Sequence, residues 1–284
     1  MKTVLDVITA TTAFFQKSGV ESPRLNIEHL LAHVMGKRRM DLYLEFDRPL
    51  GEKELGPLRD LVRRRAQREP LQHLLGTVEF LALTLKSDAR ALIPRPETEQ
   101  LCEMLVAQAK NADCLWKNGR IADVGTGSGC IALALANALP DATVIGLDAS
   151  DDALALAREN AECTGLSARV AFAKSDLLSA AESPLDLIVA NLPYIPTAEL
   201  AALQPEVQRD PASALDGGAD GLDIVRRLIP QAAEKLRSGG LLALELGLDQ
   251  PAVLAAEFSA PGWRDTRIVK DHQGRERFLF TTHG

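Results

Sequence analysis

Between residues 121 and 245, short apolar segments alternate with alanine-rich stretches of helical length. Five of the apolar segments have the length and composition of buried strands: residues 121–124, 143–147, 170–173, 185–190 and 240–245. Parallel strands need crossover connections, which are usually helices packed on the faces of the sheet. The alternation therefore predicts an α/β domain with a mostly parallel sheet, whose ligand sites lie at the carboxyl ends of its strands.

Two further segments near the end of the chain, 267–270 and 277–280, flank a turn that contains Gly274. We expect these segments to form a closing antiparallel hairpin. The hairpin would bring the predicted sheet to seven strands.

Residues 1–75 have a helical pattern instead. Thr3 and Asp6 have the spacing of a capping box before a first helix. Apolar spacing and proline and glycine punctuation predict further helices over residues 23–35, 41–46 and 57–68. We therefore expect a small N-terminal helical domain.

The pattern changes again at Gly76, where residues 76–96 suggest a β-hairpin linker. Its expected parts are a strand within 77–85, a turn at 86–88 and a second strand at 91–93. Pro94 and Pro96 exclude a regular helix, and a helical pattern starts at Glu97. The predicted organisation is a helical domain, a linker and an α/β domain, at residues 1–75, 76–96 and 97–284.

The charge of the chain is divided unevenly. Residues 1–75 hold 13 Lys+Arg and 10 Asp+Glu, which is a net charge of +3. Because the whole chain has a formal net charge of −7, the remaining residues carry a net charge of −10. An acidic α/β domain would repel a nucleic-acid backbone, which favours a protein or small-molecule substrate. No apolar run is long enough for a membrane span, no secretory signal is evident, and the four cysteines lack CxxC spacing, so we expect a cytoplasmic protein with reduced thiols.

A glycine-rich loop follows the first predicted strand and precedes an apolar helix: Asp123-Val124-Gly125-Thr126-Gly127-Ser128-Gly129. Alternate glycines let a backbone turn tightly and lie against a ligand, although a purely structural turn can use the same residues. Nineteen residues beyond Gly129, Asp148 ends the second strand, where a carboxylate can bind both hydroxyls of a ribose.

The same acid would serve NAD, but two features favour S-adenosylmethionine: the GxGxG spacing and Asp123 just before the loop. After the third strand, Asp176 and Leu177 would lie beside an adenine ring, although Asp176 could equally be a helix N-cap.

The tetrapeptide Asn191-Leu192-Pro193-Tyr194 directly follows the fourth predicted strand. The side-chain oxygen of Asn191 and the backbone carbonyl of Leu192 can each accept one N–H of a substrate NH₂ group, which positions a weakly nucleophilic nitrogen. Pro193 stiffens the loop, and the ring of Tyr194 can pack on a flat substrate group. These residues predict methyl transfer to an amide or amino nitrogen, and a turn at a sheet edge is the structural alternative.

With this tetrapeptide and the motifs before it, the sequence resembles the HemK-type protein-(glutamine-N5) methyltransferases, which modify the glutamine of the Gly-Gly-Gln loop in class-1 peptide chain release factors. The similarity extends beyond the tetrapeptide to residues 70–76, 92–99 and 210–222, and so covers nearly the whole chain.

The resemblance implies a Rossmann-like methyltransferase domain, S-adenosyl-L-methionine as cofactor and release factors as protein substrates. Because nothing in residues 1–75 looks catalytic, we expect the helical domain to recognise the protein substrate. The resemblance also implies that cofactor is bound by Gly125 to Gly129, Asp148, Asp176 and Leu177, and that Asn191 touches both cofactor site and substrate amide. The family usually has Asn-Pro-Pro-Tyr, so Leu192 is a departure, one that also resembles adenine-dimethylating rRNA methyltransferases. Because a carbonyl does the accepting, we expect Leu192 to preserve the chemistry and loosen the loop.

Three alternatives remain open at this stage. A nucleic-acid adenine or cytosine amino-methyltransferase is the nearest, and the acidic α/β domain counts against it. A regulatory protein that binds cofactor without transfer would leave the transfer loop unused. An NAD dehydrogenase lacks an evident acid or base for hydride transfer.

Other polar residues have ordinary explanations. His29 and His33 are four residues apart, but Leu30 stands where an HExxH motif needs glutamate, so no metal site is predicted. Arg63-Arg64-Arg65 favours a solvated helix end over a nucleic-acid or ribosomal-factor contact. Arg95 and Glu97 fit either an ion pair that orients the two domains or a substrate contact.

Overall fold

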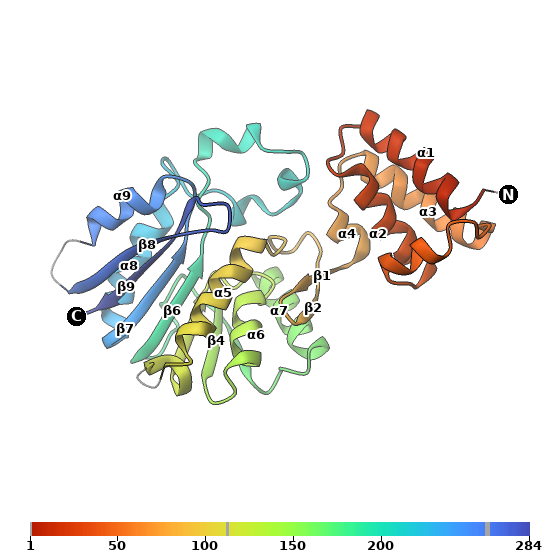
Figure 1. The fold of residues 1–284 in the computed structure, drawn as a ribbon. Coiled ribbons are helices and arrows are strands. Elements are labelled where there is room, and N and C mark those ends of the chain that lie inside the picture. The colour runs from red at the N-terminus through yellow and green to blue at the C-terminus, as the bar shows by residue number, and fades with distance from the viewer. Residues whose placement is uncertain (1, 112–113, 259–261) are drawn as a thin grey trace. The chain divides into compact units, whose positions relative to one another are not determined.

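The computed structural model describes residues 2–111, 114–258 and 262–284, which separate into two compact units. The helical unit comprises the chain up to Thr77 together with Gln204–Arg209. The sheet unit comprises Val78–Leu203 and Asp210–Gly284. Figure 1 shows the elements of both units along the chain.

The helical unit is built from four α-helices and one 3₁₀ helix in the residues that precede Thr77: α1 (Val4–Lys17), α2 (Pro23–Met35), η1 (Arg39–Leu44), α3 (Glu52–Ala66) and α4 (Leu71–Leu75). Its core contains fully buried side chains from the first two helices, among them Ile8, Phe15, Ile27, Leu30 and Leu31. Burial of one apolar stripe on each helix is the main stabilising contribution in such a bundle.

Two helix starts in this unit test the sequence interpretation. The capping box of α1 is confirmed, because Thr3 Oγ1 accepts the Asp6 N–H at 3.2 Å while Asp6 accepts the Thr3 N–H at 2.9 Å. The predicted start of α3 at residue 57 is wrong, since the helix begins at Glu52. The Gly51 N–H donates to the Glu54 carboxylate at 3.0 Å, and this cap places Pro57 inside the helix.

The arginine run at the end of α3 is also not simply solvated. Arg65 is only 5% exposed, and its guanidinium donates to Asn26 at 2.7 Å and to Glu206 at 2.8 Å. Arg68 also pairs with Glu206, at 2.5 Å. These bonds attach the segment Gln204–Arg209, which contains the short 3₁₀ helix η4 (Val207–Arg209), to the helical unit.

The hairpin is shorter than the sequence suggested. Its strands are β1 (Thr77–Phe80) and β2 (Leu83–Lys86), and the turn lies at Leu81, whose φ of 50° is left-handed. Residues 91–93 form no strand, which corrects the expected second arm. The end of β2 is instead held by α7, because the Lys86 N–H donates to Asn160 Oδ1 at 2.6 Å.

The sheet unit contains the seven-stranded sheet predicted from the sequence. Its strand order is β5-β4-β3-β6-β7-β9-β8, and β9 is antiparallel to both of its neighbours while the other pairings are parallel. The strands are β3 (Arg120–Val124), β4 (Thr143–Asp148), β5 (Val170–Lys174), β6 (Leu185–Asn191), β7 (Leu236–Glu245), β8 (Trp263–Lys270) and β9 (Glu276–His283). The chain order reverses between β3 and β6, and the carboxyl ends of strands at such a switch point form a ligand crevice.

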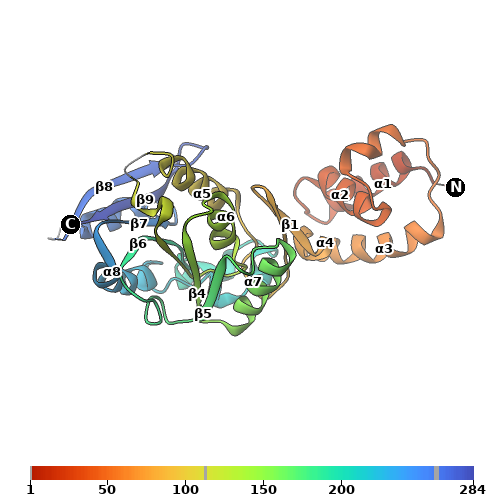
Figure 2. The same cartoon turned by 90° about the horizontal axis from the view of Figure 1, so that it is seen from below.

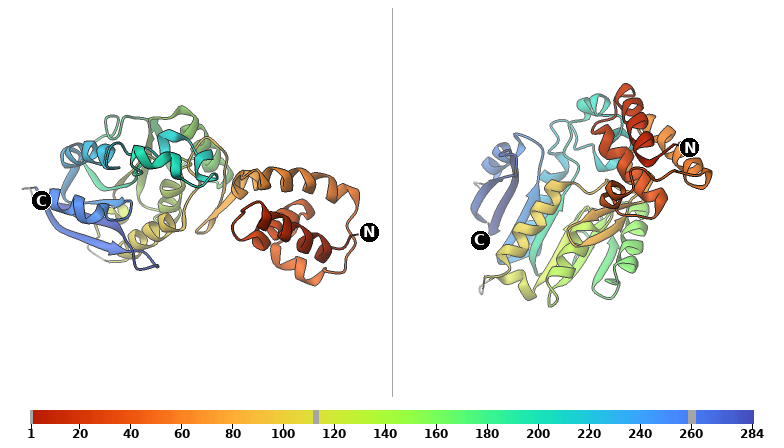
Figure 3. Two further views of the ribbon diagram at one scale, coloured as in Figure 1. Left: turned by 90° about the horizontal axis from the view of Figure 1, so that it is seen from above. Right: turned by 45° about the vertical axis from the view of Figure 1, so that its right-hand side comes forward.

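Both faces of the sheet are buried. Along β6, Leu187 and Val189 belong to one apolar core, and Ile188 and Ala190 belong to the other. The first core includes side chains of α5 (Pro96–Gln108) and α6 (Cys130–Ala138), and the second includes side chains of α8 (Asp223–Lys235) and α9 (Gln250–Glu257). Figures 2 and 3 show helices on both sides of the twisted sheet.

The remaining helical elements of the sheet unit are α7 (Asp151–Cys163), η2 (Leu115–Asn118), η3 (Thr197–Ala202) and η5 (Ala212–Ala214). In the described part of the chain, no helix is both long and apolar enough to cross a membrane.

Candidate active site

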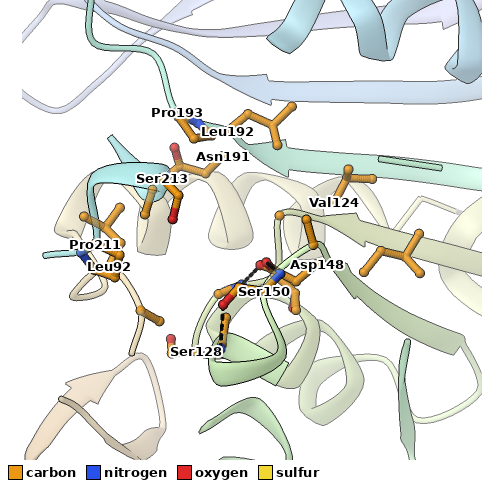
Figure 4. Close-up of a pocket in the computed structure, with 18 of the residues that line it drawn as sticks. Leu92, Val124, Ser128, Asp148, Ser150, Asn191, Leu192, Pro193, Pro211 and Ser213 are labelled. Carbon is orange, nitrogen blue, oxygen red and sulfur yellow. Dashed lines mark hydrogen bonds between the residues drawn. The ribbon is translucent and has the colours of Figure 1, made fainter. Parts of the chain in front are cut away.

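A cavity of about 240 Å³ lies within the sheet unit at the carboxyl ends of β3, β4 and β6 (Figure 4). Its walls come from segments that are far apart in the sequence: residues 90–98, 124–131, 147–153, 175–177, 191–193 and 211–227. Figure 4 shows Asn191 and Ser213 on one side of the cavity, with Asp148, Ser150 and Ser128 on the other. The switch-point crevice therefore brings most of the sequence-predicted residues together.

The glycine loop forms one wall of this cavity. Gly125, Gly127 and Gly129 have φ values of 72°, 55° and 81°, a region that disfavours other residues. A Cβ atom at Gly125 would lie 2.8 Å from Leu192 Cδ2, so the loop also needs glycine there for close packing. The predicted residues from Gly125 to Ser128 line the cavity, whereas Gly129 is outside its described lining and forms the N-cap of α6.

Asp123 supports the loop from behind. Its side chain is fully buried, and Oδ2 accepts bonds from Thr126 Oγ1 at 2.6 Å and from the Ala132 N–H at 3.0 Å. Burial raises the pKa of this carboxyl to about 7. Asp123 is outside the described lining of the cavity, so its contribution is to hold the turn at the start of α6.

Asp148 lies at the end of β4 and faces the loop. Its Oδ2 accepts the Gly127 N–H and its Oδ1 accepts the Ser150 N–H, each at 2.9 Å. Each carboxylate oxygen retains a lone pair for a second bond, which suits the two hydroxyls of a ribose.

Asp176 and Leu177 form another wall. Asp176 is two-thirds exposed and pairs with Arg227, whose Nη2 contacts the two carboxylate oxygens at 2.8 and 2.6 Å. In the turn that follows, it is Ser175 and not Asp176 whose side chain caps a backbone N–H, because Ser175 Oγ accepts the Ala180 N–H at 3.0 Å. The N-cap interpretation of Asp176 therefore does not hold.

The charges around the cavity are compatible with a cationic ligand. Three arginines line it, and each is paired with carboxylates: Arg90 with Asp88 and Glu159, Arg95 with Asp210, and Arg227 with Asp176. Asp148 instead binds backbone N–H groups. A glycine wall, an acid placed for a ribose and a lining without surplus positive charge fit S-adenosylmethionine, whose sulfonium and ammonium groups are positive.

Asn191 is the last residue of β6, and its side chain lines the cavity. Its Nδ2 donates to Thr98 Oγ1 at 3.0 Å. Leu192 is 5% exposed, and its side chain packs into the core beside Gly125. That burial argues against the looser loop expected from leucine at this position.

Pro193 also lines the cavity, whereas Tyr194 is outside its described lining. Burial raises the pKa of the Tyr194 phenol, and the Tyr194 carbonyl accepts a bond from Gln250 Nε2 at 2.7 Å. Packing of the Tyr194 ring on a substrate stays a prediction.

Known proteins with similar sequences are methyltransferases, in agreement with a site that fits S-adenosylmethionine. Residues 6–76 match the PrmC N-terminal domain family, and residues 115–246 match a methyltransferase domain family. The release factor glutamine methyltransferase of Geobacter sulfurreducens is 44% identical over 98% of this chain and 95% of its own length. That of Deinococcus radiodurans is 43% identical over 96% of each chain. The chain belongs to the release factor glutamine methyltransferase family.

Solved structures confirm the fold class. The catalytic domain of hMettl16 has a TM-score of 0.57 at 20% identity, covering 78% of this chain and 82% of that one. A methyltransferase from Pyrococcus furiosus has a TM-score of 0.53 at 17% identity, covering 72% and 90%. At such identities these structures show the fold alone.

Asp210 and Gln250 support the site of this methyltransferase and were not singled out in the sequence. Arg95 pairs with the buried Asp210 at 2.8 Å, and both belong to the sheet unit, so this pair does not orient one domain against another. Gln250 Nε2 bridges the carbonyls of Tyr194 and Asp220, at 2.7 and 3.2 Å. No local spacing marks contacts between residues so distant in the chain.

The segment 210–222 supports the loop after β6 from outside. The Ile195 N–H donates to the Leu215 carbonyl at 3.0 Å, and the Gly217 N–H donates to the Ile195 carbonyl at 2.8 Å. A Cβ at Gly217 would lie 2.7 Å from the Pro193 carbonyl oxygen. Glycine in this segment therefore permits the close approach of two backbones, which explains a motif that the sequence offered only as a resemblance.

Proposed function

We propose that this methyltransferase transfers a methyl group from S-adenosyl-L-methionine to the side-chain amide nitrogen of the glutamine in the Gly-Gly-Gln loop of class-1 peptide chain release factors. The observation that carries the proposal is the position of Asn191. Its side chain lines the same cavity as the glycine loop and Asp148, and its amide nitrogen is engaged by Thr98 Oγ1. The family membership of the chain supports the same activity and acceptor.

The cofactor would lie along the glycine wall. Asp148 would accept bonds from the ribose hydroxyls, and Leu177 would pack on the adenine, with Asp176 at its polar edge. The backbone of residues Gly125 to Ser128 would pack against the methionine portion of the cofactor. When bound, S-adenosylmethionine supplies a methyl group on a sulfonium, which is a good leaving group.

The protein then has to orient a poor nucleophile, because an amide lone pair is delocalised into its carbonyl. Asn191 Oδ1 would accept one N–H of the substrate amide, and the Leu192 carbonyl would accept the other. Two acceptors hold the NH₂ group in place and direct its lone pair at the methyl carbon. The nitrogen would lose its proton to water late in the transfer.

The helical unit carries no feature that we assign to catalysis, and we propose that it binds the release factor. A release factor substrate is consistent with a cytoplasmic enzyme. A nucleic-acid amino-methyltransferase is the remaining alternative, because Leu192 gives the tetrapeptide a form found in rRNA methyltransferases. The net charge of −10 outside residues 1–75 weighs against it.

The proposal is tested by incubating the protein with radiolabelled S-adenosylmethionine and one of three acceptors: release factor, its Gly-Gly-Ala loop variant, or ribosomal RNA. Label should appear on the intact release factor alone. Asn191→Ala should lose transfer while cofactor still binds. Label on RNA alone would contradict the acceptor, and undiminished turnover by Asn191→Ala would contradict the role of Asn191.

A further inference from the structure

Glu245 is a buried carboxyl group directly behind the proposed acceptor Asn191. It ends β7, and its partner in the neighbouring strand β6 is Asn191 itself. Its side chain is 2% exposed, and it is outside the described lining of the cavity. Thr98, also 2% exposed, comes from the first turn of α5 and does line the cavity. Three elements therefore bring these side chains together.

The hydrogen-bonding capacities of the three side chains limit how they can be oriented. Asn191 Nδ2 donates to Thr98 Oγ1 at 3.0 Å, and both side chains lie near enough to the Glu245 carboxyl to lower its pKa. An ionised carboxylate only accepts, and a hydroxyl has a single hydrogen to give. If Thr98 gives its hydrogen to Glu245, its oxygen can only accept from Asn191. The amide nitrogen of Asn191 must then face Thr98, which leaves Oδ1 for the cavity.

We propose that Glu245 and Thr98 are positioning residues that fix the amide orientation of Asn191, so that its carbonyl oxygen rather than its NH₂ group faces the substrate nitrogen. The inference rests on the proposed function. With the amide of Asn191 reversed, its N–H groups would face the N–H groups of the substrate, and the bond that orients the nucleophile would be lost.

The charge of Glu245 decides whether this direction is enforced. Burial raises the pKa of Glu245 to about 7, against the opposing effects of the neighbouring Thr98, Arg277 and Asn191 side chains. The protonated form can donate to Thr98, which frees the hydroxyl hydrogen for Asn191 Oδ1 and permits the reversed amide. Methyl transfer should therefore increase as pH rises through about 7.

Other ionisable groups surround Glu245. Arg277 from β9 lowers the pKa of Glu245, and Glu97 from α5 raises it. The charge of Glu245 in turn raises the pKa values of Tyr194, Cys102 and Cys130. Burial raises the pKa values of Tyr194 and of both thiols, so these three groups are neutral near pH 7. Asp123 acts on both thiols, and its pKa is likewise raised to about 7, so the profile of Glu245→Gln is what assigns the pH dependence to Glu245.

The test compares Glu245→Gln, Thr98→Val and Thr98→Ser with the wild-type chain, using release factor as acceptor between about pH 6 and 8.5. Thr98→Val should lower kcat by about 10-fold to 100-fold with a smaller change in KM, since a misplaced acceptor costs that much in rate. Thr98→Ser, which keeps the hydroxyl, should recover most of that loss. Glu245→Gln should lower kcat and abolish the rise around pH 7.

Asp186→Asn is a matched control. Asp186 is a buried carboxylate at the opposite end of β6, where it pairs with Arg237 and accepts the Arg120 N–H. This variant should lose stability yet keep the wild-type pH profile. If Thr98→Val fails to fold, the profile of Glu245→Gln decides. Normal kcat in the folded variants, or an unchanged rise around pH 7 in Glu245→Gln, would overturn the inference. Absence of transfer by the wild-type chain would instead overturn the proposed function.

Discussion

The contact between the glycine loop and Leu192 gives a quantitative prediction for Gly125→Ala. Gly125 has a φ of 72°, and the left-handed conformation costs a non-glycine residue about 1–2 kcal/mol. The new methyl group would also lie 2.8 Å from Leu192 Cδ2, which is closer than an ordinary contact of about 3.5–4.0 Å. Overpacking of this kind costs about 1–3 kcal/mol. The sheet unit should therefore lose about 2–5 kcal/mol of unfolding free energy.

A second substitution separates the two contributions. Leu192→Ala alone should cost about 2–5 kcal/mol, because Leu192 is 5% exposed and its removal leaves a cavity. In the double variant the new methyl group gains space but keeps its strained φ. The double variant should therefore be more stable than the sum of the single effects predicts, by about 1–3 kcal/mol.

Urea unfolding followed by tryptophan fluorescence measures these values. Both tryptophans, Trp116 and Trp263, belong to the sheet unit, so the signal reports that unit and not the helical one. An unchanged midpoint for Gly125→Ala would refute the strain argument. Strict additivity in the double variant would refute the proposed contact with Leu192.

Three further predictions concern charged groups. Asp148→Asn should weaken binding of S-adenosylmethionine by about 10-fold to 100-fold in calorimetry. The amide has only one acceptor oxygen, whereas the carboxylate has two oxygens that each accept from a backbone N–H and from a ribose hydroxyl. An affinity within twofold of the wild-type value would contradict the assignment. The pKa of Asp123 is raised from 3.8 to about 7 in the folded chain, so the folded state binds more protons than the unfolded state between these two values, and stability should fall as pH rises from about 4 to 7. Asp123→Asn should make this dependence shallower in urea titrations, and an equal slope would count against a buried neutral acid. Glu206→Gln should destabilise the helical unit by about 1–3 kcal/mol, because the buried Arg65 loses a charged partner. Faster hydrogen exchange in α3 would show this effect, and unchanged exchange would exclude it.

The architecture follows closely from local patterns in the sequence. The parallel strands β3 to β6 are short apolar runs between helical stretches, and strand ends at a switch point place Asp148 and Asn191 around one crevice. The helical N-terminal region and the seven-stranded sheet follow from the same kind of reasoning.

Misplaced elements have local causes. The turn of the β1–β2 hairpin contains Leu81 in a left-handed conformation, without the Gly, Asn or Asp that usually marks such a turn. The sequence therefore suggested one longer strand. The start of α3 was misplaced because Gly56-Pro57 resembles a boundary, whereas the cap formed by Gly51 and Glu54 lies earlier.

Contacts between distant residues were beyond prediction from one sequence. Thr98, Glu245 and Asn191 come from α5, β7 and β6, and no spacing connects them. The same holds for Arg65 and Glu206, which are 141 residues apart. Such residues are assigned only when burial and hydrogen-bond geometry are known.

Mass spectrometry of the release factor after incubation with the protein and S-adenosylmethionine measures the proposed methyl transfer itself. We expect the mass of one added methyl group, mapped to the glutamine side chain of the Gly-Gly-Gln loop, and no modification with Asn191→Ala. A methyl group on another residue, or an unmodified release factor beside methylated RNA, would contradict the proposal.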